Sequence, residues 1–231
     1  MNRFAVVTLL GLIGSFAGTG AIIADLQNDF TPVNPSGGWR YLRSTGTLGD
    51  DSSYAPLVWN PTDYRYETSG DVFPAPDLDF SLFAAGGIIH PGRGLVQGNG
   101  LGGYLIFAYI LQPGQSGDLV VNGSIAGIDP DSQGNSNGWD ILFFAGNNQS
   151  GDSVNVPWGD SAQSFAQWLG RMDEGSTVYV AIGPNGADMF DIAQLSLTLE
   201  IDDEASVPEP GSAALLAIGV GIIGLRLLSR R

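Results

Sequence analysis

Short runs of strand-forming residues, separated by clusters of turn residues, dominate the central part of this 231-residue chain. In the clearest run, residues 195–201, apolar side chains alternate strictly with polar ones, so Leu195, Leu197, Leu199 and Ile201 share one face of a strand. Turn signals return every ~8–12 residues, and no useful length of sequence has the period of an amphipathic helix. This pattern predicts an all-β fold, an antiparallel sandwich or barrel. The predicted strands are residues 101–111, 118–126, 140–145, 153–157, 164–169, 177–182 and 195–201.

Composition agrees with frequent turns and excludes some kinds of chemistry. The chain has 34 glycines and 13 prolines, a level that indicates many turns between short strands. Cysteine is absent, which excludes a disulfide framework, a thiol nucleophile and a thiolate metal site. The hydrophobic core, with any bound ions, must therefore supply the stability.

The first 24 residues have the order of a secretory signal peptide. Met1-Asn2-Arg3 is a short positive segment, residues 4–16 are apolar, and residues 18–21 are small. This arrangement predicts an N-terminal signal helix that is removed on export, with cleavage after Ala21 or Ala24. A helix packed in the core is the alternative. We assign residues 1–24 to the signal peptide and residues 25–205 to the β-sandwich domain.

The last 26 residues, 206–231, combine a short motif, an apolar run and a basic end. Val207, Pro208, Glu209 and Pro210 form the motif, and residues 213–228 follow as an apolar run. As a helix, that run would be about 24 Å long, close to the thickness of a membrane core. Arg230 and Arg231 would keep its end on the cytoplasmic side. The sequence predicts a C-terminal transmembrane helix; a buried helix of the fold is the alternative.

These three parts, in this order, closely resemble the PEP-CTERM sorting signal of Gram-negative bacteria that make exopolysaccharide. The resemblance implies export through the Sec machinery and a transient hold in the inner membrane by the C-terminal helix. It also implies cleavage near Pro208-Glu209-Pro210 by an exosortase, a membrane cysteine protease. The delivered protein would then reside at the cell surface or outside the cell, in a biofilm or exopolysaccharide matrix.

A second resemblance covers about residues 28–201. Asn34-Pro35-x-Gly37-x-Trp39-x-Tyr41, His90-Pro91-Gly92 and residues 174–184 are similar to a β-sandwich domain common in exported PEP-CTERM proteins. Gly175-Ser176 departs from the Gly-Asp usual at that place. The resemblance implies a jelly-roll-like β-sandwich, related in shape to carbohydrate-binding modules, and it implies no catalytic residue.

The part of the chain between the two signals is strongly acidic. All 24 acidic residues lie between Asp25 and Glu209, together with only five arginines and no lysine, which gives a net charge near −19. Nucleic-acid binding is excluded, because phosphate contacts need clustered basic residues. Abundant carboxylates suit either divalent cations or simple solubility.

One loop has the oxygen-rich spacing of a calcium site. Side-chain oxygens fall at positions 1, 3, 5, 7, 9 and 12 of residues 129–140, with glycine at position 6. A solvated hairpin loop is the alternative, because the same residue types form turns. The candidate Ca²⁺ ligands are Asp129, Asp131, Gln133, Asn135, Asn137 and Asp140.

Aromatic residues are concentrated between positions 39 and 66. Exposed rings stack on sugar faces, and Arg40, Arg43 and Arg65 would add hydrogen-bond donors. The alternative is that these rings belong to the core. The candidate glycan-binding residues are Trp39, Tyr41, Trp59, Tyr64 and Tyr66.

Catalytic chemistry has little support in the sequence. His90 is the single histidine, and it lies in a turn-like His-Pro-Gly segment. No spacing selects a pair of carboxylates for glycoside hydrolysis. We therefore expect a non-enzymatic cell-surface or matrix protein that binds glycans. A secreted carboxylate-dependent glycan-active enzyme and a calcium-stabilised structural module are the alternatives.

Overall fold

The structure, a computed structural model, describes residues 20–32, 37–67, 82–90, 103–128, 138–159, 161–185 and 192–202. These residues form an all-β fold with two short 3-10 helices. The helices are η1 (Asp51–Ser53) and η2 (Ala85–Gly87). The strands are β1 (Ala21–Asp25), β2 (Trp39–Ser44), β3 (Tyr54–Pro56), β4 (Val58–Asn60), β5 (Arg65–Glu67), β6 (Leu82–Ala84), β7 (Ile88–His90), β8 (Leu105–Ile110), β9 (Gly117–Gly127), β10 (Trp139–Ala145), β11 (Asn148–Gln149), β12 (Val154–Val156), β13 (Gln163–Met172), β14 (Thr177–Pro184) and β15 (Ala193–Asp202).

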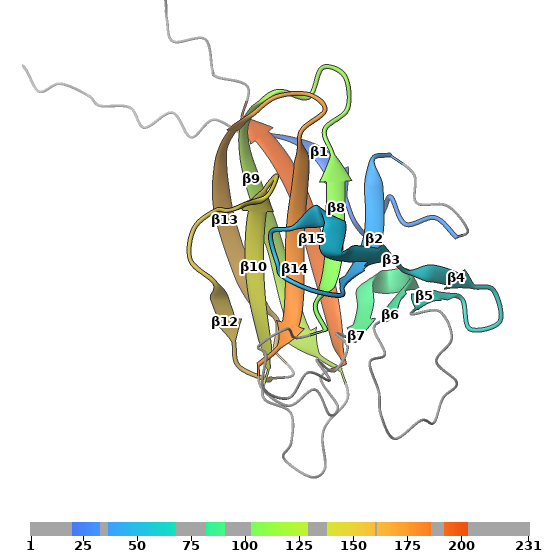
Figure 1. Cartoon of the computed structure of the whole chain (residues 1–231). Coiled ribbons are helices and arrows are strands. Elements are labelled where there is room, and N and C mark those ends of the chain that lie inside the picture. The colour runs from blue at the N-terminus through green and yellow to red at the C-terminus, as the bar shows by residue number, and fades with distance from the viewer. Residues whose placement is uncertain are drawn as a thin grey trace, which may run out of the picture.

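The strands form two sheets that face each other (Figure 1). The eight-stranded sheet has the order β13-β9-β15-β7-β6-β5-β4, and β1 pairs with the C-terminal end of β15, whose N-terminal end pairs with β7. The seven-stranded sheet has the order β11-β10-β14-β8-β2-β3, and β12 pairs with β10. Each pair of described strands is antiparallel, so the predicted antiparallel sandwich is confirmed. The predicted terminal helices lie in residues 1–24 and 213–228. Residues 1–19 and 213–228 are outside the described residues, and residues 21–24 belong to the strand β1.

Within the described ranges, we find no helix with the length and apolar character needed to cross a membrane.

The eight-stranded sheet has one buried and one solvated face. In β15 the buried pattern alternates without a break, and Leu195, Leu197, Leu199 and Ile201 are all buried, as the sequence predicts. The polar residues between them point to the outer face. The same alternation in β9 places Leu119, Val121 and Ile125 in the core. The burial of this face fixes the register, because a shift by one residue would expose every leucine of β15.

The seven-stranded sheet is buried on both faces around β8. Leu105, Phe107 and Tyr109 point into the space between the sheets, whereas Ile106 and Ala108 lie on the outer face. The segment that follows β2 covers part of that outer face. Its Leu48 and Tyr54 pack on an outer-face cluster that consists of Ile106, Ala108, Phe144, Tyr179 and Ala181. Because both faces of β8 are buried, residues 105–110 form a continuous apolar run in the sequence.

An aromatic cluster joins the two sheets at one end of the sandwich. Phe83 in β6 lies with its ring centroid 4.7 Å from Tyr41 and 5.0 Å from Phe107, both in the opposite sheet. Phe30 and Tyr66 complete the cluster through edge-on contacts. The ring of Tyr41 is buried, and its hydroxyl has no hydrogen-bond partner among the described residues. This cluster anchors the short strands β4–β7, which pair in the eight-stranded sheet.

The sandwich includes residues before position 25. In β1, Ile22 pairs with Glu200 and Ala24 with Leu199, and Ala24 is buried. The carbonyl oxygen of Ile23 accepts hydrogen bonds from Tyr109 and Gln115, at 3.3 and 3.4 Å. Residues 21–25 are therefore a strand of the folded domain.

We expect the exported protein to begin at Ile22. Cleavage after Ala21 removes from β1 only one exposed residue, whereas cleavage after Ala24 removes Ile23 and Ala24 from the core. A chain that begins at Asp25 should lose on the order of 2 kcal/mol of unfolding free energy, through lost hydrogen bonds and apolar burial. N-terminal sequencing of the exported protein, with urea unfolding of both forms, tests this. An exported protein that begins at Asp25, and is as stable as the longer form, would contradict it.

Candidate functional site

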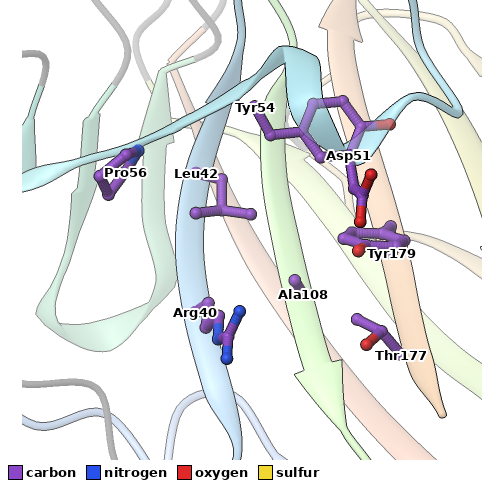
Figure 2. Close-up of a pocket in the computed structure, with 8 residues that line it drawn as sticks. All are labelled: Arg40, Leu42, Asp51, Tyr54, Pro56, Ala108, Thr177 and Tyr179. Atoms are coloured by element: carbon purple, nitrogen blue, oxygen red, sulfur yellow. The ribbon is translucent and has the colours of Figure 1, made fainter. Parts of the chain in front are cut away.

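A pocket on the outer face of the seven-stranded sheet is the candidate site. Its floor follows from strand register, because Arg40 of β2 lies opposite Ala108 of β8, and Ala108 lies opposite Tyr179 of β14. Alanine is the smallest of the three side chains, so a depression forms between its two neighbours. Thr177 borders it farther along β14. The floor is therefore apolar in the middle and polar at its edges (Figure 2).

The roof of the pocket comes from the segment that covers this face. Asp50 begins the 3-10 turn by accepting a hydrogen bond from the Ser52 backbone N–H at 3.1 Å, as a helix N-cap residue does. The backbone N–H of Gly49 donates to the Tyr54 hydroxyl at 2.7 Å, which fixes the ring. Tyr54 then meets Tyr179 edge to face, with ring centroids 5.3 Å apart. The turn thus places Asp51 and Tyr54 above the strands.

The pocket has a volume of about 330 Å³ and is open to solvent. It is bounded by three strands, by the 3-10 turn and by the short strand β3. The lining residues are Arg40, Leu42, Asp51, Tyr54, Pro56, Ala108, Thr177 and Tyr179.

The two tyrosines of the pocket stay neutral. Burial raises the pKa of Tyr54, and the hydrogen bond from Gly49 opposes that rise only in part. Burial also raises the pKa of Tyr179, with a further rise from Asp51; Thr177 and Arg40 act in the opposite direction. At physiological pH both side chains are therefore neutral phenols, and of the two rings that of Tyr54 is the more exposed, because Tyr179 is buried.

Charged side chains lie on two sides of Ala108. Arg40 is exposed and extends from β2, whereas Asp51 extends from the covering turn over Tyr179 (Figure 2). Both act on the pKa of Tyr179, which places them within electrostatic range of one ring. The pocket thus offers one cationic donor group, one anionic acceptor group and the partly exposed ring of Tyr54 over a buried apolar floor, with hydroxyl groups at its edges.

The aromatic residues predicted to bind glycan lie mainly in the core. Trp39, Tyr41 and Tyr66 are buried, so their ring faces pack against protein, in agreement with the alternative interpretation. Trp39 donates through its indole N–H to Asp29 at 3.1 Å, and Trp59 packs partly against the core. Of the five, Tyr64 is exposed, at 65 %. The structure does bring four of these rings together, because Tyr66 contacts both Tyr41 and Trp59, and Trp59 contacts Tyr64, at centroid distances of 4.8, 5.1 and 5.6 Å. Only the Tyr64 end of this row is exposed, and glycan contact there stays a prediction.

The predicted calcium loop falls largely outside the described residues. Asp129, Asp131, Gln133, Asn135 and Asn137 are not among them, and Asp140 lies in β10, where it accepts a hydrogen bond from Asn155 at 2.9 Å. Within the described ranges, acidic and histidine side chains form no group of three that could hold a metal ion. Calcium binding stays a prediction. Val207, Pro208, Glu209 and Pro210 also lie outside the described residues.

Sequence reasoning did not find the pocket. Tyr54 belongs to the aromatic-rich segment and Tyr179 to a predicted strand, but nothing in the sequence shows that they meet. The sequence pointed to Arg40 as a donor beside the five candidate glycan-binding aromatic residues, none of which lines the pocket. One signal was present: the alternation Trp39-Arg40-Tyr41 predicts that Arg40 points away from the core.

Comparison with known proteins identifies the sorting signal. Residues 206–231 match the family model described as the PEP-CTERM protein-sorting motif. Residues 206–231 therefore carry the C-terminal sorting signal of a class of exported proteins. More particularly, this is the PEP-CTERM signal, which implies processing by an exosortase and delivery across the inner membrane to the cell surface or the extracellular space.

Two further comparisons with known proteins assign no function to this chain. No curated protein matches the sequence. A solved structure, the crystal structure of the Agl-KA catalytic domain, aligns with 11% identity over 71% of this chain, at a TM-score of 0.29. The alignment spans only 27% of that chain, and so low a score shows no shared fold.

Proposed function

We propose that this exported protein is a non-enzymatic component of the cell surface or its matrix, and that it binds glycan in the pocket over Ala108. The observation that supports this is the combination of a partly exposed aromatic ring, that of Tyr54, with a cationic donor and an anionic acceptor around an apolar floor. Sugars present apolar faces that pack on aromatic rings, and hydroxyl groups that bond to polar side chains at the edges.

The size and shape of the pocket support a small part of a glycan as the ligand. A volume of about 330 Å³ lies at the lower end of the range of about 300–1,000 Å³ for small-molecule sites. One or two sugar units of a longer chain would enter it while the rest of the glycan stays in solvent. The open outer face of the sheet leaves room for that chain.

The lining of the pocket supports binding over hydrolysis. Glycosidases use a pair of carboxyl groups about 5–10 Å apart. Asp51 is the one carboxylate among the described residues that line the pocket. Export to the cell surface would place such a module next to exopolysaccharide, which is the ligand we propose.

Filling the floor of the pocket should abolish glycan binding. We expect Ala108→Leu to weaken retention on the host exopolysaccharide at least tenfold, because the larger side chain occupies the space between Arg40 and Tyr179. Affinity electrophoresis of the processed protein measures this. Ala166→Leu, at an exposed position on the outer face of the other sheet, is the matched control, and thermal melting checks that both variants fold.

Three results would contradict the proposal in different ways. Unchanged retention by Ala108→Leu would place the glycan site elsewhere. An absence of retention on the host exopolysaccharide and on a glycan array would reject glycan binding. Shortened oligosaccharides after incubation with the wild-type protein would show a hydrolase.

A further inference from the structure

The two charged groups of the pocket are without ionic partners in the described part of the protein. Among the described residues, none forms an ion pair or a hydrogen bond with the Arg40 guanidinium. Arg65 shows the contrast, because it contacts Asp63 at 3.1 Å and Glu67 at 2.6 Å. The Arg40 guanidinium is thus available to a ligand at the edge of a pocket, in a strongly acidic domain.

Asp51 is the counterpart of Arg40 on the other side of the pocket. Its backbone carbonyl accepts from Tyr54 in the turn, whereas its carboxylate has no described hydrogen-bond partner. It lies over Tyr179 (Figure 2). One free donor group and one free acceptor group thus border the same space, so a ligand that both accepts and donates hydrogen bonds would satisfy both.

The charges of the pocket and of the domain limit which glycans can bind to both Arg40 and Asp51. The pocket itself is formally neutral, with one arginine and one aspartate, while the part of the chain between the sorting signals carries about 19 negative charges in excess. A polyuronate chain would be repelled by that field and by Asp51 at the site. A neutral sugar unit is not repelled, and each of its hydroxyl groups can both accept from arginine and donate to aspartate.

We propose that the pocket selects neutral glycans, with Arg40 donating to one sugar hydroxyl and Asp51 accepting from another. This inference rests on the proposed glycan-binding function and adds the class of ligand. Charged partners strengthen such hydrogen bonds, so each of the two side chains should contribute substantially to affinity.

The test compares two variants that keep shape but remove charge. Arg40→Gln and Asp51→Asn are each expected to weaken binding of neutral gluco-, galacto- or manno-oligosaccharides about tenfold or more, measured by calorimetry on the processed protein. Wild-type affinity should change less than twofold between about 50 and 500 mM salt, because no net charge is neutralised. Arg171→Gln and Asp152→Asn, on exposed positions outside the pocket, change the net charge equally and should leave the affinity unchanged.

The sign of the Asp51→Asn effect decides between ligand classes. If the pocket takes an anionic glycan, the wild-type protein should bind oligogalacturonate, Asp51→Asn should strengthen that binding, and Arg40→Gln should abolish it. That result, with loss of binding in Ala108→Leu, would overturn the neutral-ligand inference but keep the glycan site. Neutral binding that neither variant weakens would also overturn it. Binding of none of these oligosaccharides would instead reject the proposed function.

Discussion

Phe83→Ala is expected to lower the free energy of unfolding by about 3–5 kcal/mol, one of the two largest effects we expect from a single substitution in this domain. The Phe83 side chain is fully buried and contacts two rings of the opposite sheet, with centroid distances of 4.7 Å to Tyr41 and 5.0 Å to Phe107, and the ring of Phe30 at 5.1 Å. Alanine would leave a cavity where β6, a strand of three residues, packs on the opposite sheet. So short a strand has few ladder hydrogen bonds, and packing must therefore hold it.

Urea unfolding of the processed protein measures this loss. Trp168→Ala is the matched control, because Trp168 is also a large aromatic residue in a strand of the eight-stranded sheet but is 61 % exposed. We expect it to cost less than about 1 kcal/mol, as surface substitutions do. Equal losses in the two variants would show that the aromatic cluster does not join the sheets.

The strands that could be predicted are those whose own sequence carries a long hydrophobic pattern, either an alternation or a continuous apolar run. β15 alternates over ten residues, and β8 is apolar throughout, because a sheet and a covering segment bury both of its faces. All seven predicted strands are present, with ends that differ by a few residues. The antiparallel sandwich follows from such patterns because each records which face is buried.

The strands between residues 39 and 90 were not identified, and most of them are too short to carry a pattern. β3, β4, β5, β6 and β7 have three residues each, and they are held by pairing and by the aromatic cluster. A strand of three residues is too short to show a clear alternation of apolar and polar side chains. The aromatic richness of this segment was informative, but it was open to two interpretations, and burial decides for the core at Trp39, Tyr41 and Tyr66.

The pocket could not be predicted because its parts come from distant positions. Residue 40, residues 51–56, residue 108 and residues 177–179 meet only through the order β14-β8-β2 and through the segment that crosses it. Its central feature is a small side chain, Ala108, between two large ones. Neither the strand order nor that juxtaposition is encoded in any local pattern.

The two ends of the described domain lie on the sheet that does not carry the pocket. Ala21 pairs with Ile201, so the described domain begins and ends side by side on the eight-stranded sheet. The pocket lies on the outer face of the other sheet. A tether that follows Asp202 would therefore leave the domain from the sheet that does not carry the pocket.

Gly87→Ala is expected to cost about 3 kcal/mol, because two separate requirements exclude a side chain at this position. Gly87 has φ +82°, a conformation that costs other residues roughly 1–2 kcal/mol. A Cβ atom there would also fall on the Leu195 carbonyl oxygen of β15 and 2.7 Å from Gln27 Nε2. That Gln27 amide donates to Leu195 and Gly86 at 3.0 and 3.1 Å, so the added methyl group would disturb both hydrogen bonds.

Gly86 separates these two causes, since it is the adjacent residue and also has a positive φ, +78°, but has open space where a Cβ would be. Gly86→Ala should therefore show the conformational cost alone, about 1–2 kcal/mol, and Gln27→Ala should show the lost hydrogen bonds alone. Urea unfolding of the three variants tests this. If Gly86→Ala and Gly87→Ala lose the same stability, close packing of η2 against β15 contributes nothing. If Gly87→Ala loses roughly the sum of the other two, the turn before β7 is held to the last strand by that contact.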